Sequence, residues 1–204
     1  ENPFNDMLPR FHQDADFIYA TDAYPIGLPA WIPQRMKDIQ AVYSDNEHFS
    51  TEGLSPFPML SGGQWKVTPI EVDPPQHTAY RTILNPLFTP TRLKSLDEKV
   101  RQTARDFIAK FKDKGECEFM DDFAFKFPIA VFLDLMGLPQ ERMEQFLEWE
   151  HMLLHSTDLE GIIVGTQQVV AYLQEVIDDR MQNPRDDLVS IAVTSEIDGR
   201  KPTN

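Results

Sequence analysis

Apolar residues from position 73 onward recur every three or four positions, which is the spacing of helices with one buried face. The clearest run begins near Thr91 and contains Leu93, Leu96, Val100, Ala104, Phe107, Ile108 and Phe111. Helices are also predicted over 73–85, 128–136, 140–155 and 166–182, and from Asp186. The first of these would have Asp73 as its N-cap and Pro74 at its first helical position.

The segment before residue 73 has a different pattern, because prolines, glycines and aromatic residues interrupt any helical spacing. It predicts a β-like stretch at 30–33 and a short helix at 38–43. Residues 50–72 read as a long irregular loop, a kind of segment that in compact domains is usually functional or disordered. Its apolar side chains favour order. Because predicted helices dominate and β structure is minor, the chain as a whole is predicted to be mainly α, of the α+β class.

Charge and composition narrow the functional classes. The 204 residues include 19 Lys and Arg against 33 Asp and Glu, a formal net charge of −14. General binding to nucleic acid or to an anionic membrane is therefore not expected, because both need a positive surface. The hydrophobic content of 41% indicates a packed chain, and its apolar stretches are too short to span a bilayer. A single cysteine, Cys117, cannot form an internal disulfide, so a cytoplasmic location is expected.

Other familiar chemical motifs are incomplete. His151 and His155 lie one turn apart on a predicted helix, which is a possible metal-ligand spacing. Met152 stands where the zinc-protease pattern has Glu, and no third ligand is evident, so a structural role is favoured. Pairs of adjacent acids occur at 121–122, 178–179 and 186–187. They lack the spacing of a calcium loop and are expected to cap helices or to face water.

His77 and Arg81 form the most suggestive polar pair. Positions 77, 81 and 84 lie nearly in line on a helix, so the two side chains stack one turn apart beside Leu84. An arginine fork and a histidine N–H could together hold a buried anion. The alternative is a surface histidine and an arginine paired with a nearby acid, and the two residues alone favour it because exposed polar pairs are common on helices.

Several motifs around this pair follow one another in the order of a known enzyme family. Along the chain they are Asn46-Glu-His-Phe-Ser50, Asp73-Pro-Pro-Gln-His-Thr-Ala-Tyr-Arg81, Asn85-Pro86, Phe88-Thr-Pro90, Gly115-Glu-Cys-Glu-Phe119, Phe127-Pro-Ile-Ala-Val-Phe132, Gly137-Leu-Pro139, 172–180, Asp186-Asp-Leu-Val-Ser190 and Ile197-Asp-Gly-Arg200. In this order they resemble cytochrome P450 monooxygenases, and the soluble bacterial branch that includes the camphor hydroxylase most of all. The resemblance begins at about Trp31.

The resemblance implies the N-terminal part of a single P450 catalytic domain, truncated before the central oxygen-activating helix. Residues 1–50 would be an N-terminal segment with short strands and a helix, 51–72 the substrate-roof loop, and 73–204 a helical region. The whole enzyme would insert one oxygen atom from O₂ into a small apolar molecule, with terpenoids among the candidates. This segment alone would not be active.

The resemblance also assigns a cofactor, haem b (iron protoporphyrin IX), whose propionates His77 and Arg81 would bind. The axial cysteine is expected beyond Asn204. Cys117 is rejected as that ligand because it lies where the family has a short strand far from the iron. No catalytic residue and no metal ligand are therefore expected in this segment.

For the substrate pocket, the resemblance makes the loop from Leu54 to Ile70 a variable roof. The predicted substrate contacts are Phe57, Trp65, Val67, Leu153 and Leu154. For each of them the alternative is ordinary core packing. The camphor-type pocket uses a tyrosine hydroxyl near position 65, where Trp65 offers only an N–H donor, so camphor itself is not the expected substrate.

The expected electron donor is an iron–sulfur ferredoxin, which as an acidic partner needs a local basic patch. The candidate residues are Arg81, Arg92, Lys94, Arg101 and Arg105. The alternative is that they are solvated positions paired along the helix with acids such as Glu98. No nucleic acid and no membrane is expected as a partner. A function of another class also stays open, a non-enzymatic acidic helical module that binds an apolar ligand without haem.

Overall fold

The computed structural model describes residues 2–23, 28–156, 158–197 and 199–201. The chain forms two compact units, Glu1–Glu52 and Gly53–Asn204, which are considered separately below. The expected organisation as part of a single catalytic domain stays a prediction.

The first unit contains the only sheet in the described part of the chain. Strand β1 (Phe17–Ala20) pairs antiparallel with β2 (Ala30–Pro33), and the facing Tyr19 and Trp31 rings have centroids 4.9 Å apart. The helical elements of this unit are a π-helix at Pro3–Met7, α1 at Leu8–Asp14 and α2 at Met36–Ser44. The predicted β stretch and the short helix after it are confirmed. The hydrophobic pattern did not locate the partner strand β1, although the resemblance implies short strands within residues 1–50.

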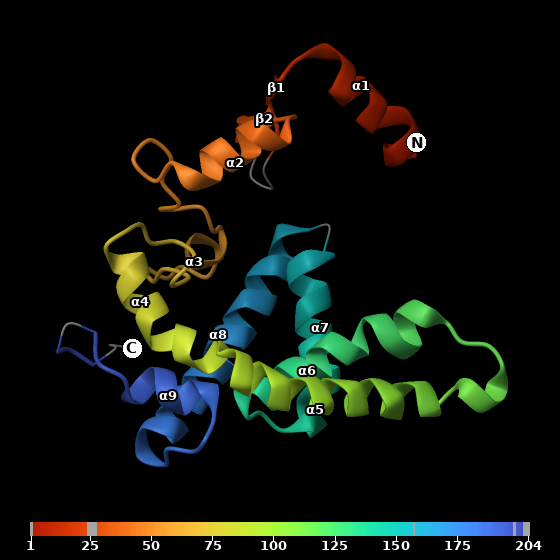
Figure 1. Ribbon diagram of the computed structural model, residues 1–204, viewed down its shortest axis with the longest axis vertical. Helices are drawn as coiled ribbons and strands as arrows, with labels where there is room; N and C mark the ends of the chain where they lie inside the picture. Colours follow the sequence, from red (N-terminus) through yellow and green to blue (C-terminus); the bar gives the residue numbers. More distant parts are fainter. Residues whose placement is uncertain (1, 24–27, 157, 198, 202–204) are drawn as a thin grey trace. The chain divides into compact units, whose positions relative to one another are not determined.

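The second unit is helical (Figure 1). Its α-helices are α3 (Phe57–Leu60), α4 (Gln76–Leu84), α5 (Pro90–Ala109), α6 (Lys126–Met136), α7 (Met143–Leu154), α8 (Leu159–Gln182) and α9 (Leu188–Thr194). Shorter 3₁₀ and π turns lie at Asn85–Phe88, Lys112–Lys114, Met120–Ala124 and Gln140–Arg142. Ile197 and Arg200 form an isolated antiparallel bridge. None of the described helices combines the length and the apolar character that a membrane span requires.

The predicted starts of α4 and α8 were wrong. Helix α4 begins at Gln76 rather than Pro74, with Pro75 and not Asp73 at the N-cap. A residue that precedes a proline is pushed out of the helical region, so Pro74, which precedes Pro75, cannot begin the helix. Helix α8 begins before the predicted Thr166, because the Asp158 carboxylate caps it by accepting the Gly161 N–H at 2.6 Å.

The core of the second unit lies where α6, α7, α8 and α9 meet. Its buried apolar residues are Leu133, Leu138, Phe146, Trp149, Val176 and Val189. The Trp149 indole N–H donates to Gln168 at 2.8 Å, which links α7 to α8. The two helices approach closely at Gly165, where an added Cβ would lie 2.8 Å from the Met152 Cβ. This packing fixes the face of α8 that lines the candidate site.

Candidate functional site

An apolar cavity of about 430 Å³ lies between the segment 57–67 and the helices α7 and α8. It is lined by Phe57, Trp65, Val67, Leu153, Thr166, Val169, Val170, Leu173, Gln174 and Ile177. All of these residues belong to the second unit, and α3 packs directly on α8. The cavity therefore joins the predicted roof loop to two helices that are distant from it in sequence.

The polar groups at this cavity are few. The Thr166 hydroxyl is buried and donates to the Ile162 carbonyl oxygen at 2.8 Å, so its proton is already used within α8. The Gln174 side-chain NH₂ donates to Asp178 at 3.1 Å, and its carbonyl oxygen receives no hydrogen bond from a described residue. The cavity thus offers an apolar wall and one open acceptor, which suits a mostly apolar molecule.

Four of the five predicted pocket residues line this cavity. Phe57, Trp65 and Val67 come from the loop and Leu153 from α7. Leu154 does not line it and is 65% exposed, because consecutive residues on a helix point about 100° apart. Contact of the four with a substrate stays a prediction.

Sequence reasoning missed the contribution of α8 to this cavity. Thr166, Val169, Val170, Leu173, Gln174 and Ile177 share one face of that helix. Their three- and four-residue spacing was visible in the sequence. Spacing alone, however, does not separate a face that lines a cavity from one that lines the core.

The Trp65 side chain is set by the backbone beside it. A Cβ added at Gly63 would collide with Cδ1 and Nε1 of the indole. Glycine at position 63 therefore lets the indole lie against the chain at the edge of the cavity. Any larger residue there would have to displace Trp65.

The helix α4 carries His77 and Arg81. His77 is half-buried and Arg81 is exposed in the last turn. Neither side chain makes a hydrogen bond or an ion pair with any described residue. The alternative in which Arg81 is paired with a nearby acid is therefore not observed in this part of the chain. Both side chains remain free to donate to an anion.

The other sequence candidates do not form a metal site among the described residues. The His151 and His155 ring centroids are 5.6 Å apart, and His155 lies 3.3 Å from the Glu150 carboxylate. Cys117 is an exposed free thiol.

Two members of the proposed basic patch are paired on α5. Arg101 contacts Asp97 at 2.9 Å, and Arg105 contacts Glu98 at 3.5 Å. Such exposed pairs contribute little to stability, but they partly neutralise this face of the helix. Lys94 is exposed, whereas the Arg92 side chain lies outside the described residues.

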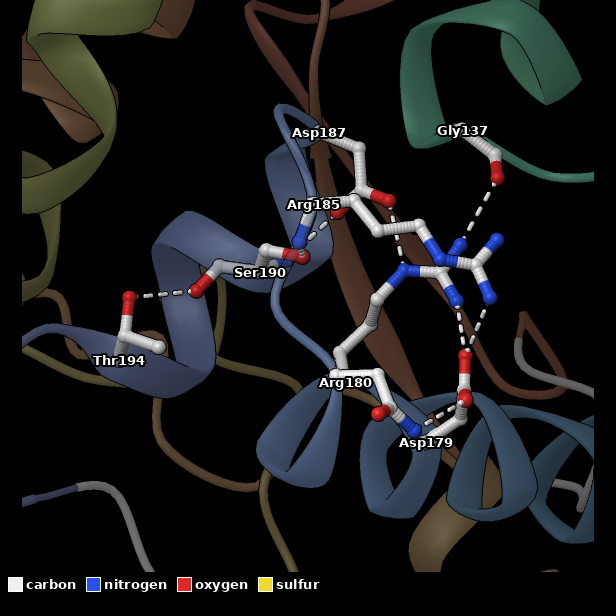
Figure 2. A network of polar contacts seen from close by, with 8 residues as sticks. Gly137, Asp179, Arg180, Arg185, Asp187, Ser190 and Thr194 are labelled. Carbon is white, nitrogen blue, oxygen red and sulfur yellow. Dashed lines mark hydrogen bonds and ion pairs between the residues drawn. The ribbon is translucent and has the colours of Figure 1, made fainter.

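A buried ionic network lies where α6, α8 and α9 meet (Figure 2). The Arg180 guanidinium donates to the Asp187 carboxylate at 2.6 Å, to the Gly137 carbonyl oxygen at 2.9 Å, and to Asp179. Only 4% of the Arg180 side chain and 6% of the Asp187 side chain are exposed. This network fixes the C-terminal end of the helix whose middle lines the cavity.

Asp187 is also the N-cap of α9, where its carboxylate accepts the Ser190 N–H at 2.7 Å. Burial alone would raise the pKa of Asp187. The hydrogen bonds from Ser190 and the charge of Arg180 outweigh burial and hold that pKa below its usual value. The predicted capping role of the acids at 186–187 is confirmed for Asp187, but its ion pair with Arg180 was not foreseen.

Comparison with known proteins identifies the fold and the family. No family model matches the chain. A probable cytochrome P450 127A1 from Sinorhizobium fredii is 36% identical over 180 residues, which cover 87% of this chain and 42% of the relative. The erythromycin C-12 hydroxylase of Saccharopolyspora erythraea is 33% identical over 185 residues, covering 83% and 44%. The chain thus spans less than half the length of these curated relatives.

Solved structures agree with these relatives. The cytochrome P450 PksS of Bacillus subtilis, from its bacillaene polyketide synthase, superposes with a TM-score of 0.80 at 25% identity, over 99% of this chain and 51% of PksS. The structure of CYP101J2 gives a TM-score of 0.77 at 25% identity, over 100% of this chain and 51% of CYP101J2. The chain is therefore a member of the cytochrome P450 family that covers the N-terminal portion of the P450 fold, and the axial cysteine of this haem-binding family lies outside it.

Proposed function

We propose that the protein containing this chain is a haem monooxygenase that inserts one oxygen atom from O₂ into a C–H bond of a small apolar molecule. Bound haem supplies the O₂ chemistry of such an enzyme. This chain binds the haem propionates and forms part of the wall around the substrate. The proposal rests on the P450 relatives and on the two sets of groups described above, the free donors of α4 and the apolar cavity.

The observation that carries the proposal is the unpaired state of His77 and Arg81. An arginine with no acidic partner among the described residues offers a planar fork of N–H donors to a carboxylate. His77, one turn before it on α4, offers a further N–H. Two carboxylate groups, such as the propionates of haem, could each accept hydrogen bonds from one of these two donor side chains.

The cavity supports an apolar substrate. Phe57, Trp65 and Leu153 provide surface against which an apolar molecule excludes water. The Gln174 carbonyl oxygen can accept one hydrogen bond from a substrate hydroxyl. The relatives include an erythromycin C-12 hydroxylase and a steroid C26-monooxygenase. The proposal therefore covers apolar molecules as a class, and terpenoids are one candidate within it.

We further propose an iron–sulfur ferredoxin as the electron donor. The contact would use the exposed cations of α5 that have no acidic partner, such as Lys94, together with Arg81 of α4. The alternative of a haem-free ligand-binding module is not favoured, because the curated relatives above are cytochromes P450.

The test is haem retention in the full-length enzyme. Arg81→Ala and His77→Ala should each lower the ratio of haem to protein after gel filtration, and the double variant should lower it further. Arg81→Lys should restore only part of the loss, because lysine lacks the planar fork. Thr78→Ala, an exposed position on the same helix, is the matched control and should keep its haem. Unchanged haem content in both single variants and in the double variant would refute the assignment.

A further inference from the structure

We propose that Glu71 is a positioning residue that holds residues 55–67 of the roof loop in the shape that forms the cavity and so selects which apolar molecules fit. The selection of ligands rests on the proposed function, whereas the hydrogen bonds that hold the loop do not depend on it. Glu71 is outside the cavity lining and outside the helix that carries His77 and Arg81.

The Glu71 carboxylate holds both ends of the segment 55–67. Its Oε1 accepts the Ser55 N–H at 2.8 Å, and its Oε2 accepts the Val67 N–H at 2.8 Å. The Glu71 N–H in turn donates to the Val67 carbonyl oxygen at 2.9 Å. One side chain therefore closes a loop whose ends are twelve positions apart in the sequence.

Burial makes this arrangement difficult to replace. Glu71 is only 2% exposed, so water has little access to its carboxylate or to the N–H groups that it satisfies. A buried N–H that loses its acceptor bears its full desolvation cost, because water cannot take the place of the acceptor. Hydrogen bonds to an ionised carboxylate are also stronger than those between neutral groups. The loop should therefore change shape when this carboxylate is altered.

Each end of the loop connects to cavity residues. The Ser55 hydroxyl accepts the Phe57 N–H at 3.3 Å, which ties the position of Phe57 to the end that Glu71 holds. At the other end Val67 itself lines the cavity, and Trp65 lies two residues before it.

Within the loop, the Gly63 N–H donates to the Pro58 carbonyl oxygen at 2.9 Å. Gly63 is the residue against which the Trp65 indole packs. All three roof residues of the cavity, Phe57, Trp65 and Val67, thus lie on a segment whose closure depends on one carboxylate.

The test compares Glu71→Gln with Glu116→Gln in the full-length, haem-loaded enzyme. Gln keeps the size of the side chain and one acceptor, but it presents NH₂ to one of the two N–H donors. Glu116 is exposed and has no hydrogen-bond or ionic partner among the described residues. Its variant therefore makes the same substitution at a position where no described contact is lost. Both proteins are first checked for equal haem content.

The first readout is amide hydrogen exchange at Ser55 and Val67. Exchange at one or both amides should accelerate in Glu71→Gln and stay unchanged in Glu116→Gln. If Glu71→Gln does not accumulate as folded protein, amide exchange in the wild-type protein tests whether Glu71 protects these two N–H groups. Its Ser55 and Val67 amides should then exchange more slowly than that of Trp65, whose N–H has no partner among the described residues. Equal, fast exchange at all three would overturn the proposal.

The second readout is ligand selectivity, which a purely structural role would leave unmoved. Imidazole and 4-phenylimidazole are both ligands of haem iron, and they differ by one phenyl ring, an apolar group of the kind that the cavity lining suits. Glu71→Gln should change the ratio of their dissociation constants by about tenfold, with little change for imidazole itself. An unchanged ratio in a variant with accelerated exchange would overturn the selective role of Glu71. A wild-type protein that binds no haem would refute the proposed function, and the exchange data would still decide whether Glu71 holds the loop.

Discussion

Replacing Asp187 by alanine should remove two interactions at once. The carboxylate caps α9 through the Ser190 N–H and pairs with the buried Arg180. Loss of an N-cap costs about 1 kcal/mol. Removing one partner of a buried ion pair costs about 3–5 kcal/mol, because the other charge stays buried without it. Arg180 keeps its contacts to Gly137 and Asp179, so the expected total is about 3–5 kcal/mol rather than the full sum.

The matched control is Asp158→Ala. Asp158 caps α8 through the Gly161 N–H and has no ionic partner in the described part of the chain, so its loss should cost only about 1 kcal/mol. Urea unfolding at pH 7, followed by far-UV circular dichroism, gives both free energies of unfolding. The reasoning is refuted if the two variants are destabilised equally.

The same pair predicts a pH dependence. The pKa of Asp187 is lower in the folded protein than in the unfolded chain, so its ionised form adds stability above the unfolded-state pKa of about 3.9. That stability is lost as the pH falls from about 3.9 through the lower folded-state pKa. The difference in stability between wild type and Asp187→Ala should therefore shrink across this acid range and be constant near neutrality. A difference that grows on acidification would contradict the direction of the pKa shift.

Three further variants test the local geometry. Gly137 has φ +66° and the Asp187 side chain packed against it, whereas Gly115 has φ +75° and open space around it. Gly115→Ala should therefore cost only the left-handed backbone strain of about 1–2 kcal/mol. Gly137→Ala should lower the free energy of unfolding in urea by more than that. Equal losses would argue against the close packing. Gly63→Ala should displace the Trp65 indole and shift its fluorescence while the far-UV spectrum stays constant; an unshifted emission would count against the contact. Trp65→Ala in the full-length enzyme should change the rank order of affinities in a panel of apolar ligands, and an unaltered order would remove Trp65 from the pocket.

Helical spacing was sufficient to predict most of the second unit. Helix α6 was predicted almost to its ends, because Gly137 provides the left-handed residue that commonly terminates a helix. Helix α8 was predicted too short, since Gly161 and Gly165 weaken the apolar pattern of its first turns. The spacing of apolar residues was thus sufficient to predict that these helices exist, whereas the start of α8 depends on its cap and the start of α4 on consecutive prolines.

The candidate site was accessible to sequence reasoning only in part. Phe57, Trp65, Val67 and Leu153 were named from the resemblance, and the structure brings them around one cavity. The role of Glu71 left no signal in the sequence, because an acid that accepts hydrogen bonds from distant backbone N–H groups has no characteristic spacing. The ion pair of Asp187 with Arg180 was missed for the same reason, since its geometry depends on how α8 meets α9.

The most direct test of the central claim is a crystal structure of the full-length, haem-loaded protein. The account predicts that the haem propionates accept hydrogen bonds from the His77 ring and the Arg81 guanidinium. It also predicts that an apolar ligand contacts Phe57, Trp65 and Val67. Propionates held by other residues, with both His77 and Arg81 turned to solvent, would contradict it.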